Sequence, residues 1–206
     1  ATVADDVLNL QARLSRWLHL DTRQGEGKMR ILVCGGAGYI GSHACTVLAG
    51  RGHDLLVADS FVNSSPRALE RVRRLAGAPV RFRQADLRVR AEVDALFEGQ
   101  RFDAVVHFAA LKAVGESCQR PLDYFDNNIS GTIHLLQAMQ AAGVKRLVFS
   151  SSATVYGDPD SVPVREDAAL RTTNPYGRTK LVMEQLIGDL CEADPSFRAA
   201  NLRYFN

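Results

Sequence analysis

A tyrosine and a lysine stand one helical turn apart in the C-terminal part of the chain, as Tyr176 and Lys180. Pro175 favours a helix start here, and the four-residue spacing then places both side chains on one face. Three serines, Ser150 to Ser152, end an apolar run that is typical of a strand. We therefore expect Tyr176 to act as a general base on a substrate hydroxyl, with Ser152 hydrogen-bonded to the same oxygen.

The lysine alone is not expected to make this tyrosine a base at neutral pH. The ordinary pKa of tyrosine is about 10, so a value near 7 requires roughly 4 kcal/mol of preferential phenolate stabilisation. An ammonium group about 6 Å away supplies only about 3 kcal/mol at an effective dielectric constant near 20. The positive charge of a bound nicotinamide would supply the remainder.

A glycine-rich segment predicts a binding site for a dinucleotide. Gly35, Gly38 and Gly41 follow an apolar run at residues 30–34 and open a helical pattern. Gly35 permits a tight turn, Gly38 leaves room for a pyrophosphate, and Gly41 lets the helix pack close to the sheet. The first amides of the helix would donate to the phosphates. The strand and helix on either side distinguish this motif from an ordinary turn.

Two aspartates follow later apolar runs. Asp59 ends the run at residues 54–58, where a carboxylate accepts hydrogen bonds from ribose hydroxyls and repels a 2′-phosphate, which favours NAD over NADP. The alternative role for Asp59 is to cap a turn or a helix. Asp86 is equally compatible with a contact to the adenine amino group and with capping of the next helix.

Apolar runs alternate with helical patterns from Met29 onward. The expected strands cover residues 30–34, 54–58, 80–84, 104–108, 146–150 and 198–204, and the expected helices cover residues 40–51, 66–75, 89–98, 121–142 and 175–191. Continuous apolar runs are typical of strands buried on both faces, and the alternation indicates a parallel sheet. The right-handed crossover rule then predicts an α/β fold, a Rossmann-like doubly wound sheet.

The segment 1–28 differs from the domain expected at 29–206. Apolar residues recur there at helical spacing, which predicts one amphipathic helix: Val3, Val7, Leu10, Leu14 and Trp17. The segment is either a dispensable extension ahead of a true start at Met29 or a helix that docks on this domain or on a partner. The sequence leaves both readings open.

Composition and charge argue against several classes of partner. The net charge of +2 over 206 residues gives no reason to expect nucleic acid or an anionic membrane, and the arginine-rich segment 67–74 fits the solvated face of a helix. No apolar run approaches the roughly 18 residues of a membrane span. The four cysteines are scattered, so we expect neither disulfides nor a metal site, and a cytoplasmic location fits best.

The chain from Met29 to Asn206 resembles the extended short-chain dehydrogenase/reductase family, and within it the sugar-nucleotide epimerases. The motifs that carry the resemblance are GGAGYIGSH at 35–43, DSFVNSS at 59–65, HFAALKAVGES at 107–117, NN at 127–128, SSSATVYG at 150–157, NPYGRTK at 174–180 and RYFN at 203–206.

The resemblance implies catalytic roles for Ser152, Tyr176 and Lys180 and NAD as the cofactor. The cofactor contacts that it implies, together with those expected above, are Gly35, Gly38, Tyr39, Ile40, Gly41, Asp59, Asn63, Ser64, Asp86, Leu87, Phe108, Ala109, Ala110, Lys112, Asn127, Ser150, Tyr176, Lys180 and Tyr204. Substrate contacts are expected at Lys112, Ser152, Thr154, Tyr176 and Asn206.

The implied reaction is interconversion of UDP-glucose and UDP-galactose through a 4-keto intermediate. The resemblance also implies a homodimer that pairs through the helices at 121–142 and 175–191, although the apolar stripes of these helices equally suit packing on the sheet. Related dehydratases place an acidic pair where this chain has Ala153 and Thr154, which disfavours elimination of water. Family members continue into a C-terminal domain that binds the UDP-sugar, so we expect this chain alone to bind NAD and to epimerise poorly. Other epimerases or dehydratases of the family, and a non-catalytic NAD-binding module, are the alternative readings.

Overall fold

The computed structural model describes residues 27–205. The amphipathic helix expected within residues 1–28 and the substrate contact expected at Asn206 therefore lie outside the described residues, apart from Gly27 and Lys28. Among the helices of the described range, none has the length and apolar character needed to cross a membrane.

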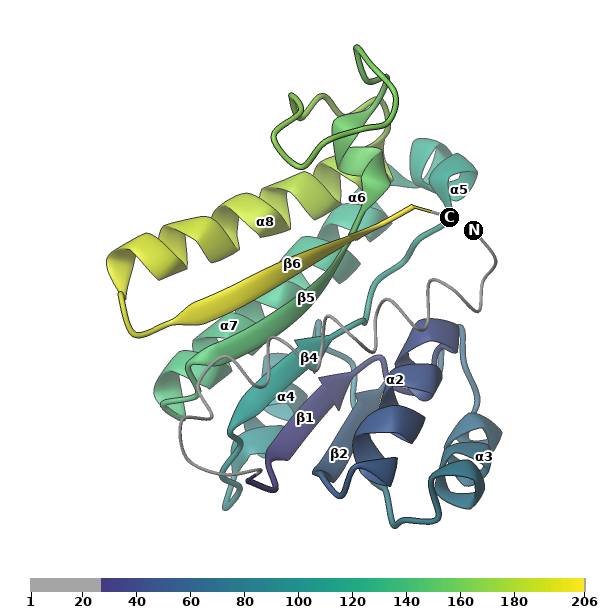
Figure 1. Ribbon diagram of the computed structural model, residues 1–206, viewed down its shortest axis with the longest axis vertical. Helices are drawn as coiled ribbons and strands as arrows, with labels where there is room; N and C mark the ends of the chain where they lie inside the picture. The colour runs from purple at the N-terminus through teal and green to yellow at the C-terminus, as the bar shows by residue number, and fades with distance from the viewer. Residues whose placement is uncertain (1–26, 206) are drawn as a thin grey trace.

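Six parallel strands form a single sheet in the order β3-β2-β1-β4-β5-β6. Their bounds are β1 Arg30–Cys34, β2 Asp54–Asp59, β3 Arg81–Gln84, β4 Ala104–His107, β5 Arg146–Ser152 and β6 Arg198–Tyr204. The strand order reverses between β1 and β4, which places a topological switch point in the middle of the sheet. The Rossmann-like fold expected from the alternating pattern is confirmed (Figure 1).

Helices cover both faces of the sheet, as Figure 1 shows. Side chains of a strand point alternately to the two faces, so Ile31 and Val33 of β1 pack with α2 (Tyr39–Gly50) and α3 (Pro66–Ala76). Leu32 of β1 packs on the opposite face, in the core shared by α4 (Arg90–Phe97), α7 (Gly131–Ala141) and α8 (Pro175–Ala193). The continuous apolar sequence of β1 follows from this burial on both sides.

The edge strands differ from the expectation that every strand is buried on both faces. All four residues of β3 are exposed, and β6 is mostly half-buried or exposed. The expectation was wrong for these two strands because they lie at the ends of the sheet. It holds for β1, β2, β4 and β5, whose residues are mostly buried.

The helix expected at 121–142 is divided into three parts. These are α6 (Pro121–Phe125), a π-helical turn η1 (Asp126–Ser130) and α7. The sequence did not reveal α5 (Val114–Gln119) or the 3₁₀ turn η2 (Ala153–Tyr156), because elements of four to six residues are too short to show a helical period.

The start of α8 is fixed locally by its sequence. The side chain of Asn174 accepts a hydrogen bond of 2.8 Å from the amide of Gly177, and Pro175 occupies the first turn. Both features are typical of helix starts. Tyr176 and Lys180 therefore lie in the first turns of α8, as their spacing predicted.

We expect Gly157, which ends η2, to be much less tolerant of a side chain than Gly143. A Cβ at Gly157 would stand 1.7 Å from the carbonyl oxygen of Arg171, whereas a Cβ at Gly143 meets no described atom within 4 Å. Both residues have a positive φ. In urea unfolding, Gly143→Ala should lower the free energy of unfolding by about 1–2 kcal/mol through strain alone. Gly157→Ala should lower it by more than about 3 kcal/mol, and equal costs would contradict this packing.

Candidate active site

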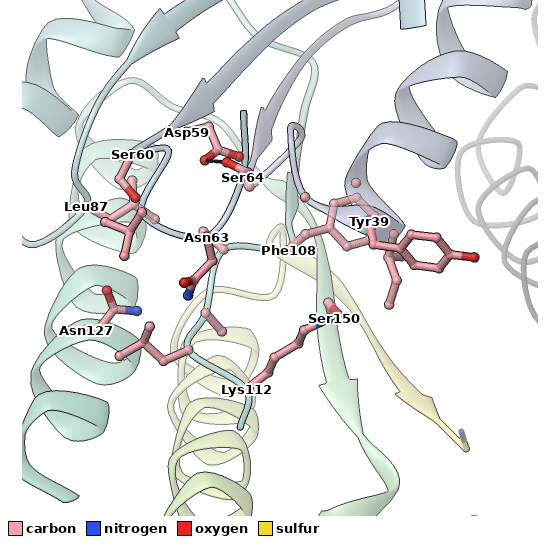
Figure 2. A pocket seen from close by; sticks show the side chains of 18 of the residues that line it. Tyr39, Asp59, Ser60, Asn63, Ser64, Leu87, Phe108, Lys112, Asn127 and Ser150 are labelled. Atoms are coloured by element: carbon pink, nitrogen blue, oxygen red, sulfur yellow. Dashed lines mark hydrogen bonds between the residues drawn. The ribbon is translucent and has the colours of Figure 1, made fainter. Parts of the chain in front are cut away.

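A cavity lies over the carboxyl ends of the strands, at the switch point of the sheet, between the glycine loop and α8. Figure 2 shows Asp59, Ser64, Asn63, Leu87 and Asn127 around it. Ligands of open α/β sheets bind at this position. Every residue expected to contact the cofactor lines this one cavity: Gly35, Gly38, Tyr39, Ile40, Gly41, Asp59, Asn63, Ser64, Asp86, Leu87, Phe108, Ala109, Ala110, Lys112, Asn127, Ser150, Tyr176, Lys180 and Tyr204.

The glycine loop is packed so tightly that two of its glycines have no room for a side chain. Gly35 has a φ of 77°, and a Cβ there would stand 2.5 Å from the amide nitrogen of Ala109. A Cβ at Gly41 would stand 2.2 Å from the carbonyl oxygen of Gly35. The role expected for Gly41 is therefore refined, because it lets α2 pack against the loop itself.

The loop also presents hydrogen-bond donors to the cavity. Gly38 is the N-cap of α2 and contributes no capping side chain. The amides of the first helical residues, which begin at Tyr39, have no acceptor within the helix. They point a partial positive charge at the cavity, as a pyrophosphate requires. Tyr39 itself lines the cavity and is 56% exposed.

Asp59 connects the glycine loop to the end of β2. One carboxylate oxygen accepts a hydrogen bond of 2.9 Å from the amide of Ala37. The other accepts bonds from the amide of Phe61, at 3.0 Å, and from the hydroxyl of Ser64, at 2.7 Å (Figure 2). A carboxylate has about four acceptor positions, so Asp59 can hold the loop and still accept a bond from a ribose hydroxyl.

Asp86 lines the cavity and is also part of a turn. Its carboxylate accepts a bond of 2.9 Å from the amide of Arg88 and forms an ion pair of 2.6 Å with the guanidinium of the same residue. Hydrogen bonding from the Arg88 side chain holds the pKa of Asp86 below its ordinary value. The side chain caps the turn before α4, since the N-cap of that helix is Val89.

The π-helical turn η1 positions the wall of the cavity that carries Lys112. Asn128 is buried. Its side-chain oxygen accepts a hydrogen bond of 2.8 Å from the amide of Leu111, and its side-chain nitrogen donates one of 3.0 Å to the carbonyl oxygen of Leu111. The same side chain donates a bond of 3.0 Å to the hydroxyl of Thr179, next to Lys180 on α8. Asn128 therefore connects the segment that carries Lys112 to the helix that carries the expected catalytic pair.

Tyr176 and Ser152 are brought together at the edge of the cavity. Burial raises the pKa of Tyr176, and a hydrogen bond with the Ser152 side chain acts in the opposite direction. The hydroxyl of Thr154 lies 3.0 Å from the Ser152 hydroxyl oxygen. Among the described residues, Thr154 is not part of the cavity lining, so the substrate contact expected there is replaced by this contact with Ser152.

Lys180 is buried beside Tyr176. Its ammonium nitrogen donates a bond of 2.7 Å to the carbonyl oxygen of Ser150 and lies 4.8 Å from the ring centroid of Phe149. It lies 5.9 Å from the ring centroid of Tyr176. Burial lowers the pKa of Lys180 to about 7, partly offset by the negative charge of Glu184. That Lys180 alone does not ionise Tyr176 stays a prediction.

Six further residues line the cavity that sequence reasoning did not identify: Ala58, Ser60, Val62, Ala85, Leu111 and Ser151. All six are direct sequence neighbours of residues that were identified. Their types carry no signal of their own, because an alanine or a valine beside a motif is also typical of packing. Counting outward from each motif along the strand ends would have found them.

We expect the tight packing at Gly41 to be needed for dinucleotide binding. Gly41→Ala should weaken the affinity for NAD at least about tenfold, a loss of about 1.4 kcal/mol, because the added Cβ displaces the loop. Gly50→Ala is the matched control, since a Cβ there meets only the carbonyl oxygen of Ala76, at 4.0 Å. Isothermal titration with NAD measures both, and equal affinities would contradict this account.

We expect the buried Lys180 to make stability depend on pH. Unfolding returns its pKa from about 7 to 10.5, so between these values the unfolded chain binds the extra proton. The stability contribution of Lys180 therefore rises with pH across this window, by at most about 1.4 kcal/mol per pH unit. The free energy of unfolding of Lys180→Met, minus that of the parent protein, should therefore be larger at pH 7 than at pH 9.5. Denaturant unfolding of both proteins measures this, and a pH-independent difference would contradict the burial of the charge.

The sequence of the chain matches the NAD dependent epimerase/dehydratase family over residues 31–206. The chain is 53% identical over 178 residues to UDP-glucose 4-epimerase of Bacillus subtilis, and 55% identical over 179 residues to UDP-glucose 4-epimerase 1 of Oryza sativa subsp. japonica. The matches cover 86% and 85% of this chain and 52% and 51% of those relatives. The chain thus spans about half the length of the curated relatives it matches.

Solved structures agree with this similarity. The UDP-glucose 4-epimerase of Stenotrophomonas maltophila with bound NAD and formylated UDP-arabinopyranose superposes with a TM-score of 0.83 at 56% identity, over 86% of this chain and 53% of that one. The enzyme of Bifidobacterium longum, in complex with NAD+ and UDP, gives 0.84 at 47% identity, over 86% and 53%. The resemblance found in the motifs is confirmed, and the chain belongs to the NAD dependent epimerase/dehydratase family.

Proposed function

We propose that the protein to which this chain belongs is a UDP-glucose 4-epimerase, which interconverts UDP-glucose and UDP-galactose with NAD as the cofactor. The observation that carries the proposal is the meeting of Tyr176, Ser152 and Lys180 at the edge of a dinucleotide cavity. The similarity to UDP-glucose 4-epimerases over half their length supports the choice of reaction.

The cavity fits NAD in both charge and shape. The tightly packed glycine loop offers helix N-terminal amides to the pyrophosphate, and Asp59 keeps an acceptor position for the adenosine ribose while it holds Ala37 and Ser64. A phosphate on that ribose would face the same carboxylate, which favours NAD over NADP. When bound, NAD would accept the hydride from sugar C4 and return it to the opposite face of the 4-keto sugar.

The residues of the chain would supply the proton transfers and the orientation. Tyr176 takes the proton of the C4 hydroxyl as the hydride leaves, and it returns that proton when the C4 hydroxyl re-forms. Ser152 donates a hydrogen bond to the same sugar oxygen, and the hydroxyl of Thr154 orients Ser152 by donating a hydrogen bond to its oxygen. Lys180 supplies a positive charge near the phenolate.

The two residues after the serines, where dehydratases of the family carry an acidic pair, are not acidic in this chain. Ala153 and Thr154 form the first turn after the serines, in η2. Neither side chain is acidic enough to protonate a leaving hydroxyl, so the site supports epimerisation over dehydration. Analysis of the products from UDP-glucose, UDP-N-acetylglucosamine and dTDP-glucose would separate a UDP-glucose epimerase from other members of the family.

We extend the proposal to a cytoplasmic homodimer. Of the two segments expected to pair, the one at 121–142 carries exposed apolar side chains, and Leu122 of α6 is 81% exposed. The four cysteines are free thiols, which fits a reducing compartment. Leu122→Glu should shift the protein from dimer to monomer in sedimentation-velocity experiments. A parent protein that is monomeric at micromolar concentration would contradict the dimer.

We expect Tyr176→Phe to abolish turnover and to preserve cofactor binding. In protein expressed from the complete reading frame, the rate of UDP-galactose conversion should fall by about 10²–10⁴-fold, because the general base is lost. The affinity for NAD, measured in parallel, should change less than about twofold, since the ring of the side chain is kept. Full activity in this variant would show that Tyr176 is not the base.

A further inference from the structure

Behind the catalytic groups, a buried carboxylate joins three elements of the fold. Glu184 lies on α8, one turn beyond Lys180, and is only 7% exposed. Its carboxylate accepts hydrogen bonds from Arg203 of β6, at 3.0 Å from Nε and 2.6 Å from Nη2. It also accepts a bond from the hydroxyl of Ser151 on β5. A buried carboxylate is tolerated only when it is paired in this way.

The bond to Ser151 fixes the part of β5 that touches the catalytic pair. Ser151 stands between Ser150, whose carbonyl oxygen accepts the bond from Lys180, and Ser152, whose side chain is hydrogen-bonded to Tyr176. Anchoring the middle residue of three restricts the backbone on both sides of it. The distance between the catalytic helix and the serine end of β5 therefore depends on Glu184.

The bond to Arg203 extends the same restraint to the last strand. Arg203 precedes Tyr204, which lines the cavity. Its guanidinium also donates a bond of 2.7 Å to the hydroxyl of Tyr156 and lies 4.9 Å from the centre of that ring. The carboxylate of Glu184 thus connects α8, β5, β6 and η2 around one point.

We propose, on the basis of the function proposed above, that Glu184 is a positioning residue of the catalytic centre. Through Ser151 it sets the serine end of β5 against α8, through Arg203 it sets the end of β6, and its charge keeps the ammonium form of Lys180 in place. It touches none of the reacting atoms in this arrangement, so it acts through its neighbours.

The charges around Lys180 make the electrostatic part of this role measurable. His107 on β4 is neutral because burial lowers its pKa to about 3. Tyr176 and Glu184 face Lys180 from α8, and Arg203 of β6 is paired with the Glu184 carboxylate. Removing the carboxylate leaves the positive charge of Arg203 uncompensated, whereas removing Arg203 leaves the negative charge uncompensated.

A matched pair of variants tests this role. Glu184→Gln and Arg203→Gln both break the same ion pair, so a purely structural role predicts the same effect from each. We expect the titration midpoint of Lys180, followed by NMR with lysine labelled with ¹³C at Cε, to fall by about one pH unit in Glu184→Gln and to rise in Arg203→Gln. Shifts in the same direction, or no shift in either folded variant, would overturn the proposal.

Ser151→Ala tests the positioning part without changing any charge. At saturating NAD, we expect the rate at which UDP-galactose reduces bound NAD to fall about tenfold, with an unchanged KM for UDP-galactose and an unchanged Lys180 midpoint. A rate equal to that of the parent protein would overturn the proposed anchoring. If the parent protein never reduces NAD with any sugar nucleotide, the proposed function fails. The positioning role within the catalytic centre then fails as well, whatever the Lys180 midpoints show.

Discussion

The burial of the Lys180 ammonium group at the junction of α8 and β5 is the constraint on which the rest of the site depends. Its pKa of about 7 means that burial disfavours the charged form of Lys180, relative to the neutral form, by about 5 kcal/mol. The carbonyl oxygen of Ser150, the ring of Phe149 and the charge of Glu184 all act against this cost. The same contacts fix the lysine beside Tyr176. The groups that make the burial tolerable are therefore the groups that hold Lys180 beside Tyr176.

The parts of the site that could be predicted from the sequence are those encoded in local spacing. Gly35, Gly38 and Gly41 sit between an apolar run and a helical pattern, and Tyr176 and Lys180 lie one turn apart. Neither motif shows where the other lies. In a parallel sheet, all carboxyl strand ends meet at one edge, where ligands bind. The structure places both motifs at that edge.

The parts that could not be predicted depend on contacts between distant residues. Glu184 follows Lys180 at the same four-residue spacing as Lys180 follows Tyr176, yet a glutamate on a helix is usually solvated. Only the fold shows that Ser151 and Arg203 surround it. The exposure of β3 and the π-helical turn at Asn128 depend likewise on neighbours that no local pattern reveals.

The proposed function requires that a hydride leave C4 of the sugar and return to the same carbon. The most direct test uses UDP-galactose that carries deuterium at C4, with protein expressed from the complete reading frame and NAD present. The account predicts UDP-glucose that keeps the deuterium at C4, because the hydride leaves and returns without contact with water. Loss of the deuterium to solvent, or the absence of any conversion, would contradict it.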